Sequence, residues 1–409
     1  MPALLFNDVT LLDATGRDPR PHTSVLCESG RVARIGAAGS IAALDGARVI
    51  DGGGMTLMPG LTDAHVHFGI TAHSDNDPPE SWVSYVLKVI ENIRIALDEG
   101  FTTVRDAGRL DTAFAAAVEN GEIAGPRILP SGSFLSQTGG HGDQRSRWND
   151  DEPAIIPGLI AQTEICDGVD AVRRAARKQI RRGATQVKLM ASGGIMSPSD
   201  PIDSLQFSVE EMAAAVREAH AYGKYVMAHC YTAGAMKNAL DAGVRSLEHG
   251  SFMTEAVARQ MVEARAYLVP TVVIMEILAR ASGIPEFSRQ KLDRVRGALA
   301  DAVAIARETG VSIGSGSDLL GPRQRRRASE IAELAKHIGS MQAIVAATRT
   351  NAELFRMEDR IGTVEEGKDA DLILVDGNPV DDPGVLVQAA NIPLVVKGGD
   401  VMKDLLASR

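Results

Sequence analysis

Residues 62–68 read TDAHVHF and place two histidines, His65 and His67, two positions apart in an apolar run. Side chains of a β-strand alternate between its two faces, so this spacing puts both imidazoles on one face. Two such imidazoles can hold one divalent metal ion at about 2.0–2.1 Å from each nitrogen. A pair of purely structural histidines has the same spacing, so this motif alone does not establish a metal site.

Seven further apolar runs follow, and segments with helical spacing of apolar residues separate most of them. These candidate strands are residues 101–107, 127–134, 185–192, 225–230, 244–250, 266–274 and 311–318. Eight strands with crossover helices over about 260 residues match a (β/α)8 TIM barrel. An open, doubly wound parallel sheet has the same periodicity. The polar residues at the carboxyl ends of the strands favour the barrel, because barrel active sites lie there.

The two ends of the chain have a different texture from its middle. Residues 1–58 and 359–409 read as short strands broken by Gly and Asp. Chain termini often lie close together, so we expect both segments to form one small β-sandwich domain. Residues 59–358 are then the barrel.

Three more candidate ligands stand at the ends of strands. His229, His249 and Asp318 fall at the carboxyl ends of the runs 225–230, 244–250 and 311–318. In a barrel these ends meet at one rim. Together with His65 and His67, they predict a metal-dependent active site.

Lys188 lies inside the apolar run TQVKLMAS, with no acidic residue beside it in the sequence. A buried and unpaired ammonium is strongly disfavoured, so this lysine is expected to be paired, neutral or modified. Burial and nearby metal charge would lower its pKa and let the amine react with carbon dioxide. The carbamate so formed is a carboxylate that can bridge two metal ions. The alternative is an ion pair with a carboxylate remote in the sequence.

The composition excludes several classes of partner. The formal net charge of −10, with only 4% aromatic residues, argues against nucleic-acid binding, which needs a basic face. There is no basic leader followed by an apolar stretch, and no run approaches the roughly 18 apolar residues of a membrane span. Cys27, Cys166 and Cys230 are predicted to be free thiols. We therefore expect a cytoplasmic protein without membrane contact.

Longer motifs sharpen this interpretation. They are MPGLTDAHVH (58–67), SQTGGHGD (136–143), VKLMASGGIMSPSDPID (187–203), MAHCYT (227–232), SLEHGS (246–251), GSDLLG (316–321) and GKDADLILVDGNP (367–379). This pattern resembles the binuclear metal-dependent amidohydrolase superfamily over nearly the whole chain. Within it, the motifs resemble the subgroup of Xaa-Pro dipeptidases (prolidases), Xaa-Arg/Lys carboxypeptidases and the ochratoxin-hydrolysing amidase.

The resemblance implies a ligand set and a mechanism. It implies one zinc ion on His65, His67 and Asp318, a second on His229 and His249, and a bridging carboxylated Lys188. A hydroxide held between the two ions is expected to attack the amide carbonyl, while Asp318 passes a proton to the leaving nitrogen. The donor types do not separate zinc from cobalt or manganese. The family pattern also implies a homo-oligomer.

Two residues are expected to contact the substrate. Tyr231 follows His229 by two positions, and in the resembling dipeptidases a tyrosine there contacts the terminal carboxylate. His141, in the glycine-rich loop TGGHGD, similarly resembles a substrate-contact residue. A packed loop aromatic and a loop-bracing histidine are the alternative interpretations.

Two charged features are interpreted as structural. Arg105 and Asp106, which end the run 101–107, are expected to form an ion pair. The basic run 323–327 (RQRRR) is expected to be a solvated loop or a subunit contact. Its place after Asp318 could also add positive charge for an acidic substrate.

We therefore expect a zinc hydrolase that cleaves the amide bond of Xaa-Pro-like dipeptides or N-acyl amino acids, which are small-molecule substrates. A hydrolase of a non-peptide, ochratoxin-like amide is the first alternative. A catalytically inactive scaffold of the same fold is the second. Specificity is expected to lie in the loops 198–203 and 275–285.

Overall fold

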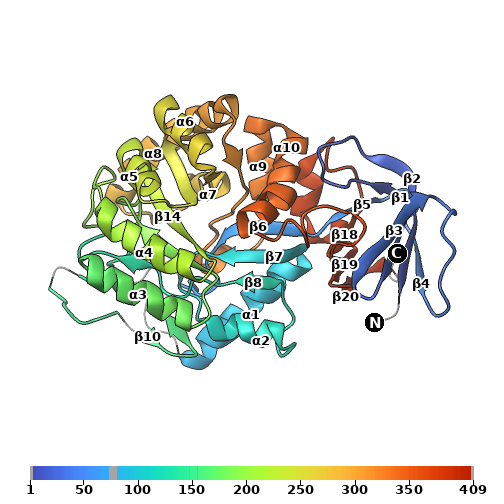
Figure 1. Cartoon of the computed structure of the whole chain (residues 1–409), viewed down its shortest axis with the longest axis horizontal. Helices are drawn as coiled ribbons and strands as arrows, with labels where there is room; N and C mark the ends of the chain where they lie inside the picture. The colour runs from blue at the N-terminus through green and yellow to red at the C-terminus, as the bar shows by residue number, and fades with distance from the viewer. Residues whose placement is uncertain (1–2, 73–80, 147, 154, 407–409) are drawn as a thin grey trace.

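A computed structural model describes residues 3–72, 81–146, 148–153 and 155–406. Figure 1 shows a barrel surrounded by helices and, beside it, a smaller unit of strands that contains both chain termini. His73, which the sequence predicts to lie on the surface, is outside the described residues.

The barrel contains the eight strands predicted from the sequence. They are β6 (Leu61–Val66), β7 (Phe101–Asp106), β8 (Arg127–Leu129), β13 (Gln186–Met190), β14 (Tyr225–Thr232), β15 (Ser246–Phe252), β16 (Tyr267–Val269) and β17 (Ser312–Ile313). Neighbouring strands pair in parallel. The N–H of Ala64 donates to the carbonyl of Ser315 (2.9 Å), and that of Thr185 donates to the carbonyl of Pro130 (2.8 Å). These two contacts join the ends of the strand sets into the expected closed barrel.

The helices pack around the outside of the strands (Figure 1). They are α1 (Trp82–Asp98), α2 (Thr112–Glu119), α3 (Val169–Arg181), α4 (Val209–Ala221), α5 (Ala233–Asp241), α6 (Glu255–Ala264), α7 (Val272–Arg280), α8 (Glu286–Thr309), α9 (Ser329–Ile338), α10 (Ser340–Val345) and α11 (Asn351–Phe355). Local sequence sets their ends. Ser208 and Glu211 form a reciprocal capping box at the start of α4, and Gly310 ends α8 in the left-handed conformation.

Alternation along the strands decides what faces the barrel interior. Val187 and Leu189 belong to an apolar cluster with residues of the surrounding helices, so Lys188 between them points the opposite way. His229 on β14 is in register with Met190 on β13 and Glu248 on β15. Residues in register on neighbouring strands point to the same side, and Met190 shares its face of β13 with Lys188. The side chains of Lys188, His229 and Glu248 are therefore gathered inside the barrel.

Both ends of the chain contribute to a second sheet, as the sequence predicts. Its strands are β1 (Leu4–Leu11), β2 (Arg20–Glu28), β3 (Arg31–Ala37), β4 (Arg48–Asp51), β5 (Thr56–Pro59), β18 (Leu372–Val375), β19 (Leu394–Lys397) and β20 (Asp400–Asp404). The antiparallel pair β5–β18 joins the two terminal segments. Hydrogen bonds connect all eight strands into one mixed sheet with its own apolar core.

Short elements complete the described chain. They are the strands β9 (Leu135–Ser136), β10 (Ile155–Ile156), β11 (Ile160–Ala161) and β12 (Glu164–Ile165), the 3-10 helices η1 (Gly321–Arg323), η3 (Pro383–Val387) and η4 (Ala389–Asn391), and the π-helical turn η2 (Ala346–Thr350). Among the described helices, none combines the length and apolar character needed to cross a bilayer. Cys27, Cys166 and Cys230 are buried free thiols, as predicted.

Candidate metal centre

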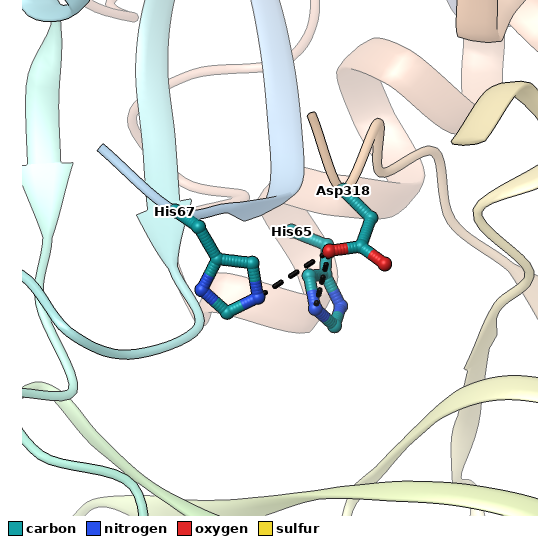
Figure 2. A group of neighbouring side chains, drawn as sticks. All are labelled: His65, His67 and Asp318. Carbon is teal, nitrogen blue, oxygen red and sulfur yellow. Dashed lines mark ion pairs between the residues drawn. The ribbon is translucent and has the colours of Figure 1, made fainter. Parts of the chain in front are cut away.

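Three predicted ligands converge where β6 ends and the segment after β17 begins (Figure 2). The Nε2 atoms of His65 and His67 lie 3.6 and 3.3 Å from Oδ1 of Asp318. All three ligand atoms lie within 4.8 Å of one another. Two atoms that each bind a tetrahedral ion at about 2.0–2.1 Å lie about 3.4 Å apart. The three side chains therefore fit one shared divalent cation.

The Nδ1 atoms of His65 and His67 already have hydrogen-bond partners. Nδ1 of His65 lies 2.7 Å from Oε2 of Glu248, and Nδ1 of His67 lies 3.0 Å from the carbonyl of Gly108. Such contacts fix the tautomer and turn each Nε2 lone pair toward the centre. Burial also lowers the pKa of His65 well below its usual value, so this ring is neutral, as a ligand must be.

His229 and His249 lie directly beside this group. Their ring centroids are 4.7 Å apart, and His249 is 5.2 Å from His65. Nδ1 of His249 lies 2.7 Å from the Thr271 hydroxyl, whereas Nε2 of His229 lies 3.2 Å from the carbonyl of Gly193. Burial lowers the pKa of His249 to about 4 and that of His229 well below its usual value. Among the described residues, Nε2 of His249 and Nδ1 of His229 have no hydrogen-bond partner, so both atoms could serve as ligands.

Lys188 lies inside the barrel and is only 1% exposed. Burial lowers the pKa of its ammonium to about 8, although the charges of Glu248 and Asp318 oppose the shift. Within the described residues the ammonium makes no hydrogen bond or ion pair. Lys188 therefore loses its proton more readily than an exposed lysine, and the described residues offer its ammonium no ion-pair partner.

The predicted ion pair between Arg105 and Asp106 is wrong, because adjacent residues of a strand face opposite sides. Nη2 of Arg105 lies 2.9 Å from Oε1 of Glu248 inside the barrel. The Asp106 carboxylate instead accepts the N–H groups of Gly108 (2.9 Å) and Phe68 (3.3 Å). Sequence reasoning missed Glu248, although a carboxylate beside a ligand histidine in a buried strand was an available signal.

The two predicted substrate contacts face the same centre. The His141 ring stacks on His229 with centroids 4.4 Å apart, and its Nδ1 lies 2.8 Å from the Ser197 hydroxyl. The Tyr231 ring lies 4.8 Å from that of His229 and 5.0 Å from that of His249. Burial raises the pKa of Tyr231 well above its usual value, so its hydroxyl stays protonated and can donate a hydrogen bond.

The loop 193–200 packs closely against His141. A Cβ atom at Gly194 would lie 2.0 Å from the His141 ring, so only glycine permits this approach. Lys291 on α8 also holds the loop. Its ammonium donates to the carbonyls of Gly194 (3.0 Å), Ser197 (2.7 Å) and Asp200 (2.6 Å). Lys291 carries no sequence signal, because it is one of many polar residues on a helix.

The expectation of a solvated basic run is wrong for part of the run. Arg325 is exposed and pairs with Glu91 (2.8 Å), but Gln324 and Arg327 are buried. The charge of Arg327 is tolerated because its Nη1 lies 3.2 Å from the buried carboxylate of Asp63. Arg327 is therefore an internal residue rather than a source of surface charge.

A cavity of about 900 Å³ lies at the other end of the barrel. It is lined by residues that begin β8, β13 and β14, together with several cations. Arg127 pairs with Asp371 (2.9 Å), Arg360 pairs with Asp369 (2.8 Å), and Lys397 donates to the carbonyl of Gly125 (2.6 Å). These cations already have partners within the chain, and the position of the cavity at the amino ends of the strands separates it from the metal centre.

A barrel with histidines and a carboxylate gathered at the carboxyl ends of its strands is typical of metal-dependent amidohydrolases, which act on C–N bonds. Residues 56–402 match the amidohydrolase family, and the chain belongs to this family.

Three known proteins illustrate this relationship. The structure of a prolidase in complex with N-methylphosphonate-L-proline is 37% identical, with a TM-score of 0.93 over 98% of this chain and 100% of that chain. A Xaa-Pro dipeptidase with methionine bound in its active site is 31% identical, with a TM-score of 0.88 over 98% and 99% of the two chains. Ochratoxinase from Aspergillus niger is 34% identical over 365 residues, which cover 85% of this chain and 75% of the relative.

Proposed function

We propose that this protein is a binuclear zinc hydrolase that cleaves the amide bond before a carboxyl-terminal residue. Its substrates are Xaa-Pro-like dipeptides or N-acyl amino acids. The observation that carries this proposal is the convergence of four histidines and Asp318 near the buried Lys188, which has no partner among the described residues. The similarity to a prolidase that binds a phosphonate analogue of proline supports the substrate class.

The ligand set is divided between two cations in this proposal. His65, His67 and Asp318 would hold one, and His229 and His249 the other. The Lys188 amine would react with carbon dioxide, losing one proton and gaining a carboxylate that would serve as a further ligand. Two divalent cations supply Lewis acidity and lower the pKa of bound water toward about 7.

Asp318 is suited to move protons during the reaction. Burial alone would raise the pKa of Asp318, but the nearby His65 and His67 lower it below its usual value. The carboxylate is therefore ionised and can accept a proton from the attacking water. It can then return that proton to the nitrogen that leaves the scissile amide.

Tyr231 and His141 would orient the substrate. The protonated hydroxyl of Tyr231 can donate to the carboxylate of the terminal residue, which is a charge-assisted hydrogen bond. Burial lowers the pKa of His141 to about 4, so its ring is neutral and can contact a polar substrate group without adding charge.

A second function is favoured by one observation, the 34% identity with ochratoxinase. In that case the same centre hydrolyses a non-peptide amide, such as an aryl, ochratoxin-like amide. An inactive scaffold is the third alternative. It is disfavoured because burying Lys188 with no partner in the described part of the chain costs stability and serves no purpose in a scaffold.

Turnover by the zinc-loaded protein on a matched panel tests these alternatives. The panel contains Xaa-Pro dipeptides, other dipeptides, N-acyl amino acids, the carboxamide of each, and aryl amides that lack a carboxylate. We expect the free carboxylates to be hydrolysed at least tenfold faster than their carboxamides. Faster turnover of the aryl amides would favour the second function. Less than one metal ion per chain, without turnover, would favour the scaffold.

A further inference from the structure

We propose that Arg327 is a positioning residue that fixes His65, His67 and Asp318 relative to one another and so sets the metal affinity of their site. This inference rests on the metal centre of the proposed function and is independent of its substrate. Arg327 comes from the basic run after Asp318, to which neither the fold nor the proposed reaction assigns a task.

Arg327 makes a set of directed contacts inside the protein. It is 0% exposed, and its Nη1 lies 3.2 Å from Oδ2 of Asp63 and 3.0 Å from the Ser317 hydroxyl. Its Nη2 donates to Oε1 of Gln324 at 3.1 Å. The planar guanidinium therefore holds three side chains at fixed angles, which an ammonium cannot reproduce.

Of these partners, Asp63 bonds the backbone of the ligand His65, and Ser317 is the chain neighbour of the ligand Asp318. Oδ1 of Asp63 accepts the N–H of His65 (3.0 Å) and the N–H of Ser317 (2.9 Å). Ser317 precedes Asp318, whose own N–H donates to the carbonyl of His65 (2.8 Å). Asp63 therefore ties the ligand strand β6 to the segment that carries Asp318, and Arg327 neutralises its buried charge.

The third partner, Gln324, bonds the backbone of the remaining ligand, His67. Nε2 of Gln324 donates to the carbonyl of His67 at 2.9 Å. The Glu99 carboxylate accepts the N–H groups of Arg326 (2.6 Å) and Arg327 (2.9 Å), which anchors this segment to the end of α1. One guanidinium is thus connected, through a single residue each time, to the backbone of all three ligands.

The charge of Arg327 points to positioning rather than to a direct role. A guanidinium near a cation site repels the cation, and Asp63 offsets that repulsion only while the pair stays intact. Metal sites also require their ligands to be held within about 0.5 Å of the productive geometry. Loss of these contacts is therefore expected to weaken binding at the His65, His67 and Asp318 site specifically.

Zinc titration against a chromophoric chelator tests the inference in Arg327→Lys, Gln324→Leu and the control Arg325→Gln. Arg325 belongs to the same run, but its side chain is 64% exposed. We expect the first two variants to bind one zinc ion per chain about 10- to 100-fold more weakly than the unmodified protein, with the second ion unaffected. The visible spectrum of the cobalt-loaded variants should change for one ion only. Arg325→Gln should match the unmodified protein.

The outcomes separate this inference from the proposed function. If the unmodified protein binds no zinc tightly, the proposed function and this inference both fail. If it binds two ions and the folded variants bind them equally well, only the inference fails. Gln324→Leu keeps the pair between Arg327 and Asp63, so it decides the question if Arg327→Lys does not fold.

Discussion

Nδ1 of His65 lies 2.7 Å from Oε2 of Glu248, and both side chains are shielded from solvent, with 1% and 0% exposure. The same carboxylate is bonded by Arg105 (2.9 Å) and by the Ser246 hydroxyl (2.6 Å). A carboxylate held in this way orients the imidazole and makes its other nitrogen a better ligand. Glu248 thus supports a metal ligand without facing the substrate.

Replacing Glu248 by Gln is expected to weaken zinc binding about 10- to 100-fold, because His65 loses its anionic partner. The free energy of unfolding should also fall by about 3–5 kcal/mol, because Arg105 is left buried without a counter-charge. Chelator competition and denaturant unfolding measure the two effects. Glu255→Gln, on the exposed surface of α6, is the control. Unchanged zinc affinity in folded Glu248→Gln would rule out this role.

Carbon dioxide is expected to control assembly of the site through Lys188. The pKa of the buried amine is lowered to about 8, so the neutral, reactive form prevails above that pH. Zinc uptake by the metal-free protein should therefore accelerate with added bicarbonate and with rising pH through about 8. Lys188→Ala should lose activity and regain part of it with short carboxylic acids, whereas the exposed Lys336→Ala should behave normally. Uptake independent of bicarbonate at every pH would contradict carboxylation.

Asp318→Asn is expected to lower kcat by about 10²- to 10⁴-fold, because the amide cannot carry the transferred proton. One zinc ion should remain bound with unchanged affinity, since His229 and His249 are intact. Steady-state kinetics and metal analysis on the same preparation measure both effects, with the exposed Asp301→Asn as the control. Turnover within tenfold of the unmodified protein would remove Asp318 from proton transfer.

Tyr231→Phe is expected to discriminate between substrates that have a terminal carboxylate and the matching carboxamides. A hydrogen bond to a charged group contributes about 1.5–3 kcal/mol, so kcat/KM should fall about 10- to 100-fold for the carboxylate only. Paired kinetics on one dipeptide and its amide make the comparison. An equal loss on both substrates would show that the ring packs against His229 and His249 without binding the carboxylate.

Lys291→Met is expected to release the loop 193–200 from α8, because three carbonyls lose their shared donor. KM should rise while zinc content stays constant, since the loop positions His141 through Ser197 rather than binding metal. Hydrogen exchange of residues 193–200 reports the release directly. Gln290→Ala, the exposed neighbour on α8, is the control. Unchanged exchange would mean that other contacts hold the loop.

The sequence was informative wherever local periodicity determines geometry. Alternation of side chains along the run 62–68 predicted that His65 and His67 share one face of their strand. By the same rule, Lys188 points away from its apolar neighbours Val187 and Leu189 and into the barrel. The repeated strand and helix pattern predicted the barrel, whose construction brings the carboxyl ends of distant strands together. Proximity of the ligands therefore followed from topology, without any knowledge of side-chain contacts.

Only the tertiary structure decided which charged residues are partners. Arg105 pairs with Glu248, 143 residues away, and not with its neighbour Asp106. Arg327 pairs with Asp63 inside the protein, whereas Arg325 two positions earlier is exposed. A sequence shows which side chains carry charge, but the cost of burying that charge depends on what the fold places within a few ångströms of it. That distance is set by how strands and loops remote in the chain pack together, so no local pattern contains it.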